Sequence, residues 1–494
     1  MIRKTVPLIA LASLAACSMA PKYVRPALPV PPSWPVGDAY LKQSEAALPS
    51  VSYRDIFRDP RLQKIVEQAL VNNRDLRIAA ANIATARAQY RIQRAALLPE
   101  IDDSLNFSHR DNGTSGVTFG NTTGGTTGGG LTSGGSGVRE TYSTSLGLTA
   151  FEIDLFGRVR SLTTVAQNSY FATEAAARAT RLTLVGDIAS AWLNYASDQS
   201  LLKIARDTAA NAQRSVTLTK ARVDGGVAPR TDLDQAQIVQ QTALSDLAAQ
   251  TTAVAQDVNA LHLLVGAPVD PALLPTSIEE AASTIAEPPA GLDSGILLRR
   301  PDVVQAEYTL RAANAQIGAA RAALFPRISL TALAGLASTS LSNLFTGGAF
   351  NYSVAPSVSY PIFRSGAGRA GVAQSQAQRD AALASYEKSI QTAFSEVANA
   401  LARRGTVDSQ FAAQEALAKS SEDNYRLSEA RYRGGIDTFL QSLVAQRSLY
   451  TAQRSLVTTR LTGATNLVTL YRALGGDAAL DVTPSGPQPA APPR

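Results

Sequence analysis

The two halves of this chain repeat one series of motifs. Gly157 and Gly225 are separated by as many residues as Gly366 and Gly434. Two pairs of segments also match across the halves: residues 95–101 (AALLPEI) with 322–328 (AALFPRI), and residues 221–226 (ARVDGG) with 430–435 (ARYRGG). Self-similarity of this kind predicts one duplicated unit. Each half is expected to contain a helix, two strands, a very long helix, a turn at a Gly-Gly pair and a further helix.

Composition excludes some classes of function. The net charge of +6 is spread over many arginines without a basic cluster, which argues against a nucleic-acid surface. Aromatic residues make up only 6% of the chain, which suits closely packed helices better than a thick globular core. Beyond the first residues no run of about 18 apolar residues occurs, so any further contact with a bilayer is expected from strands.

The first residues are typical of a secretory signal peptide, which is predicted over residues 1–16 because a basic start precedes an apolar run at 6–14. Residues 14–17 (LAAC) then match the lipobox of bacterial lipoproteins, in which Cys17 becomes the lipid-modified N-terminus. Cys17 is the only cysteine, so it cannot form a disulfide within the chain. Ser18 after the cysteine, rather than aspartate, favours the outer membrane. An ordinary signal peptide with an unrelated cysteine is the alternative.

Residues 17–60 are rich in proline and are expected to form an extended, lipid-anchored segment. From residue 61 the apolar side chains follow the spacing of an amphipathic helix, which is predicted over 61–98 and ends before Pro99.

Beyond Pro99, apolar and polar residues alternate, which is the pattern of strands. Four strands are predicted, at residues 100–110, 142–155, 328–336 and 352–362. Residues 113–137 are rich in glycine, threonine and serine and are predicted to form a mobile loop. Strands of about ten residues can cross a bilayer when tilted, although the pattern also fits a soluble pair of hairpins. Because open sheet edges are not tolerated in lipid, several chains would have to pool their strands, and three chains would give twelve.

The long helices are predicted from the absence of proline between Pro99 and Pro229 and between Pro361 and Pro484. Each can extend for about 100 Å. The long helices are expected at residues 158–224 and 367–433, and shorter ones at 230–265 and 436–474. The helices at 61–98 and 230–265 should stack end to end beside the first long helix.

The chain is thus divided into a first repeat at residues 61–270, a linker at 271–292, a second repeat at 293–478 and a proline-rich tail at 479–494. The predicted fold class is an α+β membrane protein that is internally duplicated. It has a long α-helical barrel and four β-strands per chain, and if these strands span a membrane, a trimer would pool them into a 12-stranded transmembrane β-barrel.

The sequence offers no pattern typical of catalysis. His109 and His262 are far apart and lack cysteine partners, so no metal site is predicted. No nucleophile elbow, phosphate loop or dinucleotide fingerprint occurs. Glu152 and Asp154 have the spacing of a carboxylate pair, but they close a strand, and polar lumen-facing residues are the preferred interpretation. The chain is predicted not to be an enzyme and to bind no cofactor.

A series of short motifs covers nearly the whole mature chain. In chain order they are residues 21–26 (PKYVRP), Trp34, 57–62 (FRDPRL), 73–76 (NRDL), 86–89 (ARAQ), 152–158 (EIDLFGR), 298–302 (LRRPD), 317–322 (IGAARA), 360–363 (YPIF) and 432–436 (YRGGI). In this order and spacing they resemble the outer-membrane factors of tripartite efflux pumps, TolC-like channels of the NodT/OprM-like lipoprotein branch. The glycine- and threonine-rich loop is longer than is usual in that family.

The resemblance implies a homotrimer in the bacterial outer membrane, lipid-anchored, with a helical tunnel in the periplasm. Its partners would be a periplasmic adaptor (membrane fusion) protein and an inner-membrane proton-driven pump of the resistance-nodulation-division (RND) type. The chain would be the passive exit channel for drugs or other small toxic compounds. An exit duct for type I protein secretion and a non-channel coiled-coil lipoprotein are the alternatives.

Two candidate sites follow from this architecture. The Gly-Gly turns should lie at the end of the tube farthest from the outer membrane and contact the adaptor; they comprise Gly225, Gly226, Val227, Gly434, Gly435 and Ile436. A periplasmic gate is expected just above them, where three copies of ionisable side chains can pair; its candidates are Asp224, Leu427, Glu429, Arg431 and Arg433. Solvated helix ends are the alternative interpretation of these residues.

Replacing Cys17 by serine should abolish lipidation, because the thiol is the acceptor of the lipid. Cells labelled with radioactive palmitate should incorporate no label into Cys17→Ser. The variant should still insert as a trimer, since apolar strand faces give a barrel its own bilayer affinity. Label retained in the variant would contradict the lipidation of Cys17.

Overall fold

The computed structural model describes residues 18–35, 52–111, 138–288, 294–478, 482–483 and 486–487. The predicted signal peptide, Cys17, the loop at 113–137 and most of the tail at 479–494 lie outside the described residues. The chain divides into two compact units. Unit 1 comprises residues 1–23, 87–167 and 311–380, and unit 2 comprises residues 24–86, 168–310 and 381–494.

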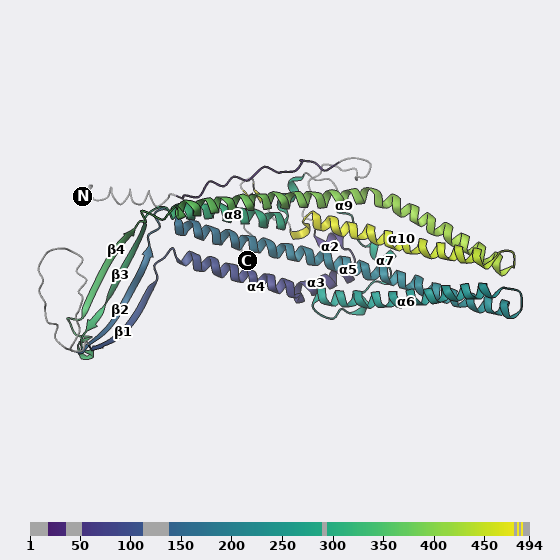
Figure 1. Cartoon of the computed structure of the whole chain (residues 1–494), viewed down its shortest axis with the longest axis horizontal. Helices are drawn as coiled ribbons and strands as arrows, with labels where there is room; N and C mark the ends of the chain where they lie inside the picture. Colours follow the sequence, from purple (N-terminus) through teal and green to yellow (C-terminus); the bar gives the residue numbers. More distant parts are fainter. Residues whose placement is uncertain are drawn as a thin grey trace. The chain divides into compact units, whose positions relative to one another are not determined.

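Unit 1 contains a four-stranded antiparallel sheet in the order β1-β2-β3-β4 (Figure 1). The strands are Ile101–Asp111 (β1), Val138–Glu152 (β2), Arg327–Ser338 (β3) and Phe350–Ser359 (β4). The short 3₁₀ helix η4 (Leu341–Asn343) lies between β3 and β4. The four predicted strands are confirmed, with bounds that differ by up to four residues. A non-channel coiled-coil lipoprotein, which would lack alternating strands, is contradicted by this sheet.

The register of the strands gives the sheet one apolar and one polar face. Ile101, Leu148, Ala332 and Val354 lie opposite one another in turn across the four strands. The same face carries Leu105, Phe107, Tyr142, Leu146, Leu330, Leu336, Phe350, Tyr352 and Val358. The other face is small and polar, with hydroxyl pairs at Ser104–Ser145 (3.0 Å) and Ser329–Ser357 (2.7 Å). Outer-membrane strands have this alternation, with apolar side chains toward lipid and polar ones toward the lumen.

A β-bulge interrupts β2 between Leu148 and Phe151. Leu148 lies opposite Ala332, whereas Phe151 lies opposite Leu330, so two residues of β2 face one of β3. Ala150 in the bulge has a positive φ of 50°. The bulge therefore shifts the pairing of β2 with β3 by one residue from Phe151 onward.

The two long helices have the predicted bounds. The helix α5 spans Arg158–Asp224 and α9 spans Ala367–Arg433, with 67 residues each. Each follows a glycine in the left-handed region, Gly157 (φ 75°) and Gly366 (φ 81°). The carbonyls of these glycines accept the first helical hydrogen bonds, from the N–H groups of Ser161 and Ala370. The two repeats therefore start their long helices in the same way.

The remaining helices are shorter. The α-helices are α2 (Tyr53–Ile56), α3 (Pro60–Asn72), α4 (Arg74–Ala95), α6 (Arg230–Val265), α7 (Ile278–Ser283), α8 (Pro301–Ala322) and α10 (Phe439–Ala473). The 3₁₀ helices are η2 (Pro271–Leu273), η3 (Ser294–Arg299) and η5 (Gly476–Ala478), and the two-residue strands β5 (Val482–Thr483) and β6 (Gly486–Pro487) pair with each other. In the described part of the chain, none of the helices has the length and apolar character needed to cross a membrane.

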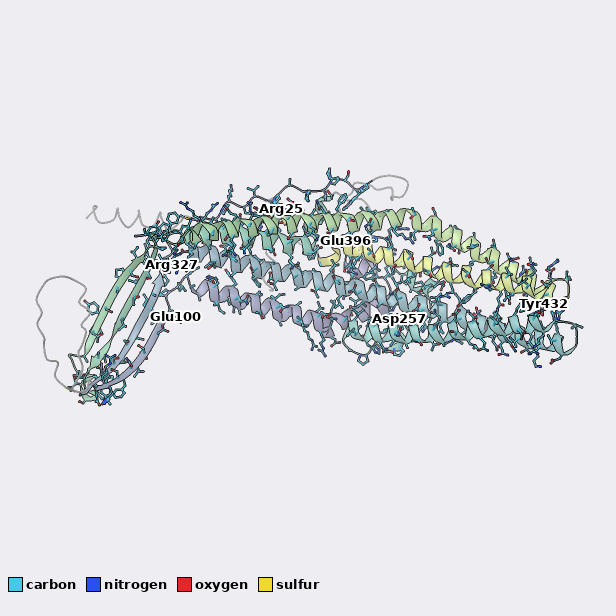
Figure 2. The ribbon with its side chains drawn as sticks, in the orientation of Figure 1. Arg25, Glu100, Asp257, Arg327, Glu396 and Tyr432 are labelled. Atoms are coloured by element: carbon cyan, nitrogen blue, oxygen red, sulfur yellow. The ribbon has the colours of Figure 1, made fainter. Side chains whose placement is uncertain are left out.

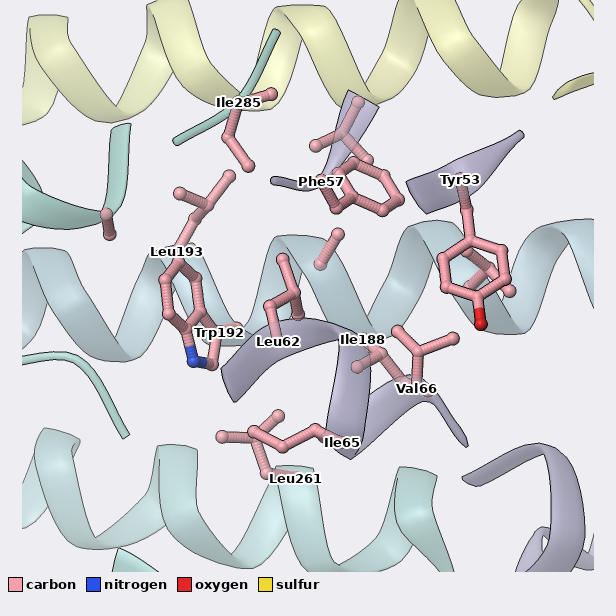
Figure 3. Packing of buried hydrophobic residues seen from close by; sticks show 14 of the residues in the cluster. Tyr53, Phe57, Leu62, Ile65, Val66, Ile188, Trp192, Leu193, Leu261 and Ile285 are labelled. Atoms are coloured by element: carbon pink, nitrogen blue, oxygen red, sulfur yellow. The ribbon is translucent and has the colours of Figure 1, made fainter. Parts of the chain in front are cut away.

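The main hydrophobic core lies in unit 2, where α2, α3, α5, α6, α7 and α10 meet (Figure 3). Trp192 of α5 is fully buried, and its indole N–H donates to the carbonyl of Leu273 (3.2 Å). Phe57 packs edge-to-face on Tyr471 of α10 with ring centroids 5.3 Å apart. Fully burying a large apolar side chain contributes about 1.5–3 kcal/mol, so this cluster is the strongest stabilising element of the unit.

Two of the family motifs have structural roles in this core. In the motif at 57–62, Asp59 caps α3 by accepting the N–H of Arg61 (2.8 Å), and Arg61 also pairs with Glu280 (2.6 Å). Burial raises the pKa of Asp59, but the hydrogen bonds from Arg61 outweigh it and hold this pKa below its ordinary value. In the motif at 298–302, Arg300 pairs with Glu396 (2.8 Å) and donates to the carbonyl of Ala473 (2.9 Å), which joins the start of α8 to the middle of α9 and the end of α10.

The predicted single helix at 61–98 is wrong, because the chain breaks at Asn73 into α3 and α4. Asn73 has non-helical angles (φ −58°, ψ 136°) and is 3% exposed. Its side-chain oxygen accepts the N–H of Leu76 (3.0 Å), and its amide donates to the carbonyl of Leu264 (2.7 Å) at the end of α6. Asparagine favours such a cap over continued helix, and the partner on α6 fixes the break.

Two segments are more structured than expected. The predicted linker at 271–292 contains η2 and α7, and Ile278 and Ala281 of α7 are fully buried in the core. The predicted extended segment at 17–60 contains the helix α2. Its described part at 18–35 has neither helix nor strand, as expected. Within unit 2 this part is held by a buried ion pair between Arg25 and Glu307 (2.6 Å) and by stacking of Trp34 on Phe394 (4.9 Å).

Replacing Asn73 by alanine should destabilise the helical unit by about 1–3 kcal/mol, because it leaves the partly buried N–H of Leu76 and carbonyl of Leu264 without this partner. Thermal unfolding of the purified protein measures the loss. Asn72→Ala is the matched control, since the Asn72 side chain makes no hydrogen bond among the described residues, and it should change stability by less than about 0.5 kcal/mol. Equal effects of the two substitutions would contradict the role of Asn73.

Candidate functional site at the helix ends

The two Gly-Gly turns have the same geometry. After α5, the N–H groups of Gly225, Gly226 and Val227 donate to the carbonyls of Ala221, Val223 and Arg222; after α9, those of Gly434, Gly435 and Ile436 donate to Ala430, Tyr432 and Arg431. The second glycine of each pair has a positive φ, 73° at Gly226 and 72° at Gly435. A side chain is disfavoured there, so the glycine ends the helix and reverses the chain.

An arginine of the first repeat contacts a tyrosine of the second at these turns. Arg222 donates to the main-chain carbonyl of Tyr432 (3.0 Å), and its guanidinium lies 4.7 Å from the centre of the Tyr432 ring. The Tyr432 hydroxyl lies 3.3 Å from Oγ1 of Thr219, which is fully buried. Figure 2 labels Tyr432 at this end of α9. Both main-chain and side-chain atoms therefore join the ends of α5 and α9.

An apolar cluster supports this contact. Tyr432 is 5% exposed and packs on Phe439 at the start of α10, with ring centroids 5.3 Å apart. Ala236 of α6 and Leu443 of α10 complete the cluster. The ends of the four helices α5, α6, α9 and α10 are thus held by one small core.

The predicted charged residues form pairs within their own turns. Asp224 pairs with Lys220 (3.0 Å), Glu429 with Arg433 (2.6 Å) and Arg431 with Asp437 (2.6 Å). The Arg431 guanidinium holds the pKa of the Asp437 carboxyl below its ordinary value. Exposed pairs of this kind contribute little to stability, so they can exchange partners at low cost. Within one chain none of them spans the two repeats.

The apolar candidates at the turns are exposed. The exposed fractions are 58% for Leu427, 69% for Val227 and 68% for Ile436. Apolar side chains exposed at the tip of a helical hairpin are available to a partner.

Sequence reasoning missed Thr219, Arg222, Tyr432 and Asp437. A comparison of the two repeats could have identified Tyr432, because the motif ARVDGG of the first repeat has valine at the position that Tyr432 occupies in ARYRGG. An aromatic residue beside a glycine turn needs apolar neighbours to cover it, and only the packing of the four helices supplies them.

The contacts of Glu152 and Asp154 do not favour acid–base chemistry. Glu152 forms a bidentate ion pair with Arg158 (2.6 Å and 2.8 Å), and Asp154 accepts the N–H of Arg160 (2.8 Å). Both carboxylates therefore anchor the start of α5. His109 lies 3.4 Å from Glu140, and no group of three metal-binding side chains occurs in the described ranges.

Open grooves run between the helices of unit 2. One of about 490 Å³ lies between α6 and α10 and is lined by Ile238, Asp246, Leu443 and Tyr450 among others. The Tyr450 hydroxyl donates to Asp246 (2.9 Å) across it. A second groove lies between α9 and α10 and includes Leu417 and Val444, which are 50% and 52% exposed. These surfaces offer apolar strips with polar borders to a helical partner.

Two carboxyl groups meet between α5 and α6, at Asp198 and Asp257. Burial, together with the nearby charge and hydrogen bond of Asp198, raises the pKa of Asp257 to about 7. The Oδ2 atom of Asp257 is buried and accepts no hydrogen bond from the described residues. A protonated Asp257 that donates to Asp198 explains this arrangement, because two neighbouring ionised carboxylates would repel.

Known proteins identify the family. The family described as "Outer membrane efflux protein" matches residues 65–267 and 293–476. Among curated relatives, the Antibiotic efflux pump outer membrane protein ArpC of Pseudomonas putida and the Toluene efflux pump outer membrane protein TtgC of the same species are each 43% identical over 465 residues. In both cases the match covers 94% of this chain and 93% of the relative. A crystal structure of a membrane protein from Pseudomonas aeruginosa is 37% identical, with a TM-score of 0.83, over 93% of this chain and 100% of that one.

The chain therefore belongs to the outer membrane efflux protein family. It is an outer-membrane component of efflux transport, and the family predicted from the sequence motifs is confirmed.

The stability of the helical unit should fall as the pH rises from about 4 to about 7. The folded protein keeps a proton on Asp257 up to about pH 7, whereas the unfolded chain loses it near the ordinary value of 3.8. The stabilisation is therefore complete below about pH 4 and is lost as the pH rises to about 7. Because the pair is only partly buried, the loss should be on the order of 1–2 kcal/mol.

Thermal midpoints at pH 4, 5.5 and 7 measure this dependence, and Asp257→Asn should flatten it. Asp207→Asn, which removes an exposed carboxylate 2.9 Å from Lys203, should leave it unchanged. A pH dependence retained in Asp257→Asn would contradict the shared proton.

Proposed function

We propose that three copies of this chain form the passive exit channel of a tripartite efflux pump. The observation that carries the proposal is the four-stranded sheet with one apolar face, one polar face and two unpaired edges. Unpaired main-chain groups are costly in lipid, so the sheet must close with the sheets of other copies. Three copies give twelve strands, which is within the range of outer-membrane barrels.

The helices also favour an assembly of copies. The helix α4 has 22 residues and none of them is buried in the single chain, although it carries apolar side chains. Ile78 and Ile92 are 58% and 72% exposed. A helix of this length needs tertiary contacts to be stable, and neighbouring copies can supply them.

The channel would work with a periplasmic adaptor and an inner-membrane pump of the RND type. The turns at Gly225–Gly226 and Gly434–Gly435, with the exposed Val227 and Ile436, are the proposed adaptor contacts. The cargo class is proposed from relatives whose names specify antibiotic and toluene efflux, and it comprises drugs, solvents and other small toxic compounds. Energy would come from the pump, and the channel itself would catalyse no reaction. Lipid attached to Cys17 would anchor the N-terminus in the outer membrane.

The proposed gate lies at the helix ends. Asp224, Leu427, Glu429, Arg431 and Arg433 would form the constriction of the trimer. The exposed ion pairs can change partners between copies, while the contact of Arg222 with Tyr432 must break or move for α9 to shift relative to α5. The gate would therefore combine weak, exchangeable pairs with one buried contact.

The function and the gate are tested together in planar bilayers. Protein purified in detergent should have the mass of three chains by light scattering and should conduct ions at a low level. Glu429→Ala with Arg431→Ala should raise the conductance at least several-fold, because both pairs at the end of α9 are lost. Cells with this variant should become sensitive to bulky antibiotics.

The matched control is Lys203→Ala with Asp207→Ala, which removes an exposed ion pair of α5 away from the turns and should leave conductance unchanged. A stable monomer without conductance would contradict the channel. A conducting trimer whose conductance is unaffected by the double substitution would move the gate elsewhere.

A further inference from the structure

The outer edges of the sheet carry features that discourage indiscriminate pairing. Asp103 lies on the apolar face of β1, between Ile101 and Leu105, and β4 contains Pro356, which has no main-chain N–H to donate. A charge directed to the apolar face and a proline are common on edge strands for this reason. Yet β1 and β4 each have one edge without a strand partner in the described sheet, so both edges need a specific partner.

The internal repeat relates the strands to one another. Ile101 of β1 corresponds to Ile328 of β3, because the segments that end in these residues match. Ile101 lies opposite Leu148, and Ile328 lies opposite Val358. Leu148 of β2 therefore corresponds to Val358 of β4, and the two hairpins are equivalent.

The structure also contains a junction between the repeats, where β2 pairs with β3. There Leu148 lies opposite Ala332, and Phe151, below the bulge, lies opposite Leu330. The main chain continues this ladder, since the N–H of Ile153 donates to the carbonyl of Ile328 (2.8 Å). This is the only strand pair in the described sheet that joins one repeat to the other.

We infer that β4 of one copy pairs with β1 of the next copy in the register of the β2–β3 junction. Ala332 corresponds to Leu105, so Val358 lies opposite Leu105 of the next copy. In the same register Val354 lies opposite His109 of the next copy. The inference rests on the trimeric channel proposed above and specifies the contact that closes it.

The ends of β2 and β4 that lead into the long helices give the same register independently. Gly157 and Gly366 begin the two long helices, so Phe151 corresponds to Tyr360 when counted back from these glycines. Leu330 corresponds to Asp103, which places Tyr360 opposite Asp103 of the next copy. The equivalence of Leu148 with Val358 and the equivalence of Phe151 with Tyr360 thus give the same register. The bulge of β2 supplies the one extra residue between Leu148 and Phe151, and β4 needs no bulge.

The pair of Tyr360 and Asp103 fixes this register chemically. The equivalent pair within the chain, Phe151 with Leu330, is apolar. A carboxylate on a lipid-facing surface is costly unless it has a hydrogen-bond partner, which the Tyr360 hydroxyl supplies. A slip of two residues would keep the faces but set Asp103 opposite Val358 or Ile362, neither of which can donate from its side chain.

Paired cysteines test the register in the intact trimer. Val358→Cys with Leu105→Cys should form disulfides between chains on mild oxidation, seen as covalent dimers and trimers on non-reducing gels. Val358→Cys with Phe107→Cys, shifted by two residues on the same face, should give at least tenfold less product. The single substitutions, which keep Cys17, measure the background.

If the first pair prevents assembly, Val354→Cys with His109→Cys tests the same register. Light scattering confirms that each variant is a trimer before oxidation. A trimer that cross-links only through the shifted pair, or through none of the pairs, overturns the inferred register and leaves the channel intact. A monomer would overturn the proposed channel itself.

The role of the polar pair is tested by adding Asp103→Leu to both cysteine pairs. Product from the shifted pair should rise at least threefold, because a slip no longer leaves a carboxylate without a donor. An unchanged ratio of the two products would overturn the assignment of Tyr360 and Asp103 as the pair that sets the register.

Discussion

Main-chain hydrogen bonding at the edges of the sheet is the constraint on which the rest of the structure depends. Each edge of a four-stranded sheet leaves a row of N–H and C=O groups without partners, and lipid offers none. The alternating faces of β1 to β4 suit a boundary between lipid and water, but they cannot satisfy these groups. The chain is therefore incomplete by itself, and the helix α4, none of whose residues is buried in the single chain, also lacks neighbours. A fold of this type is stable only as part of an assembly.

The helical unit combines strong buried contacts with weak exposed ones. The core around Trp192 and Tyr471 and the buried arginine Arg300 hold the helices where each side chain has many neighbours. Near the Gly-Gly turns the ion pairs Lys220–Asp224, Arg431–Asp437 and Arg433–Glu429 are largely exposed. Exposed pairs contribute little in water, whereas the apolar cluster around Tyr432 excludes solvent. Movement at the helix ends therefore costs far less than movement near the core.

The sequence predicted those elements that local signals determine. The bounds of α5 and α9 follow from their glycines and from the absence of proline, and the strands follow from the alternation of their side chains. The break at Asn73 was missed because asparagine also occurs inside helices, and its partner at Leu264 is distant in the chain. The helix α7 was missed because six residues have little helical preference of their own, and burial of Ile278 stabilises it. The contacts of Arg222 with Tyr432 and of Asp198 with Asp257 depend on packing between distant segments, which no local pattern indicates.

Divergence between the repeats explains how a duplicated chain acquires a contact between its halves that has no counterpart when the two repeats are exchanged. Arg222 and Arg431 occupy equivalent positions before the two turns. Arg431 pairs with Asp437, but the position equivalent to Asp437 in the first repeat is Ala228, which offers no carboxylate. Arg222 therefore directs its guanidinium to Tyr432, whose own equivalent in the first repeat is Val223. Two differences at equivalent positions, Ala228 for Asp437 and Val223 for Tyr432, thus replace a local ion pair by a contact between the repeats. Through this contact, α5 of the first repeat is held against α9 of the second.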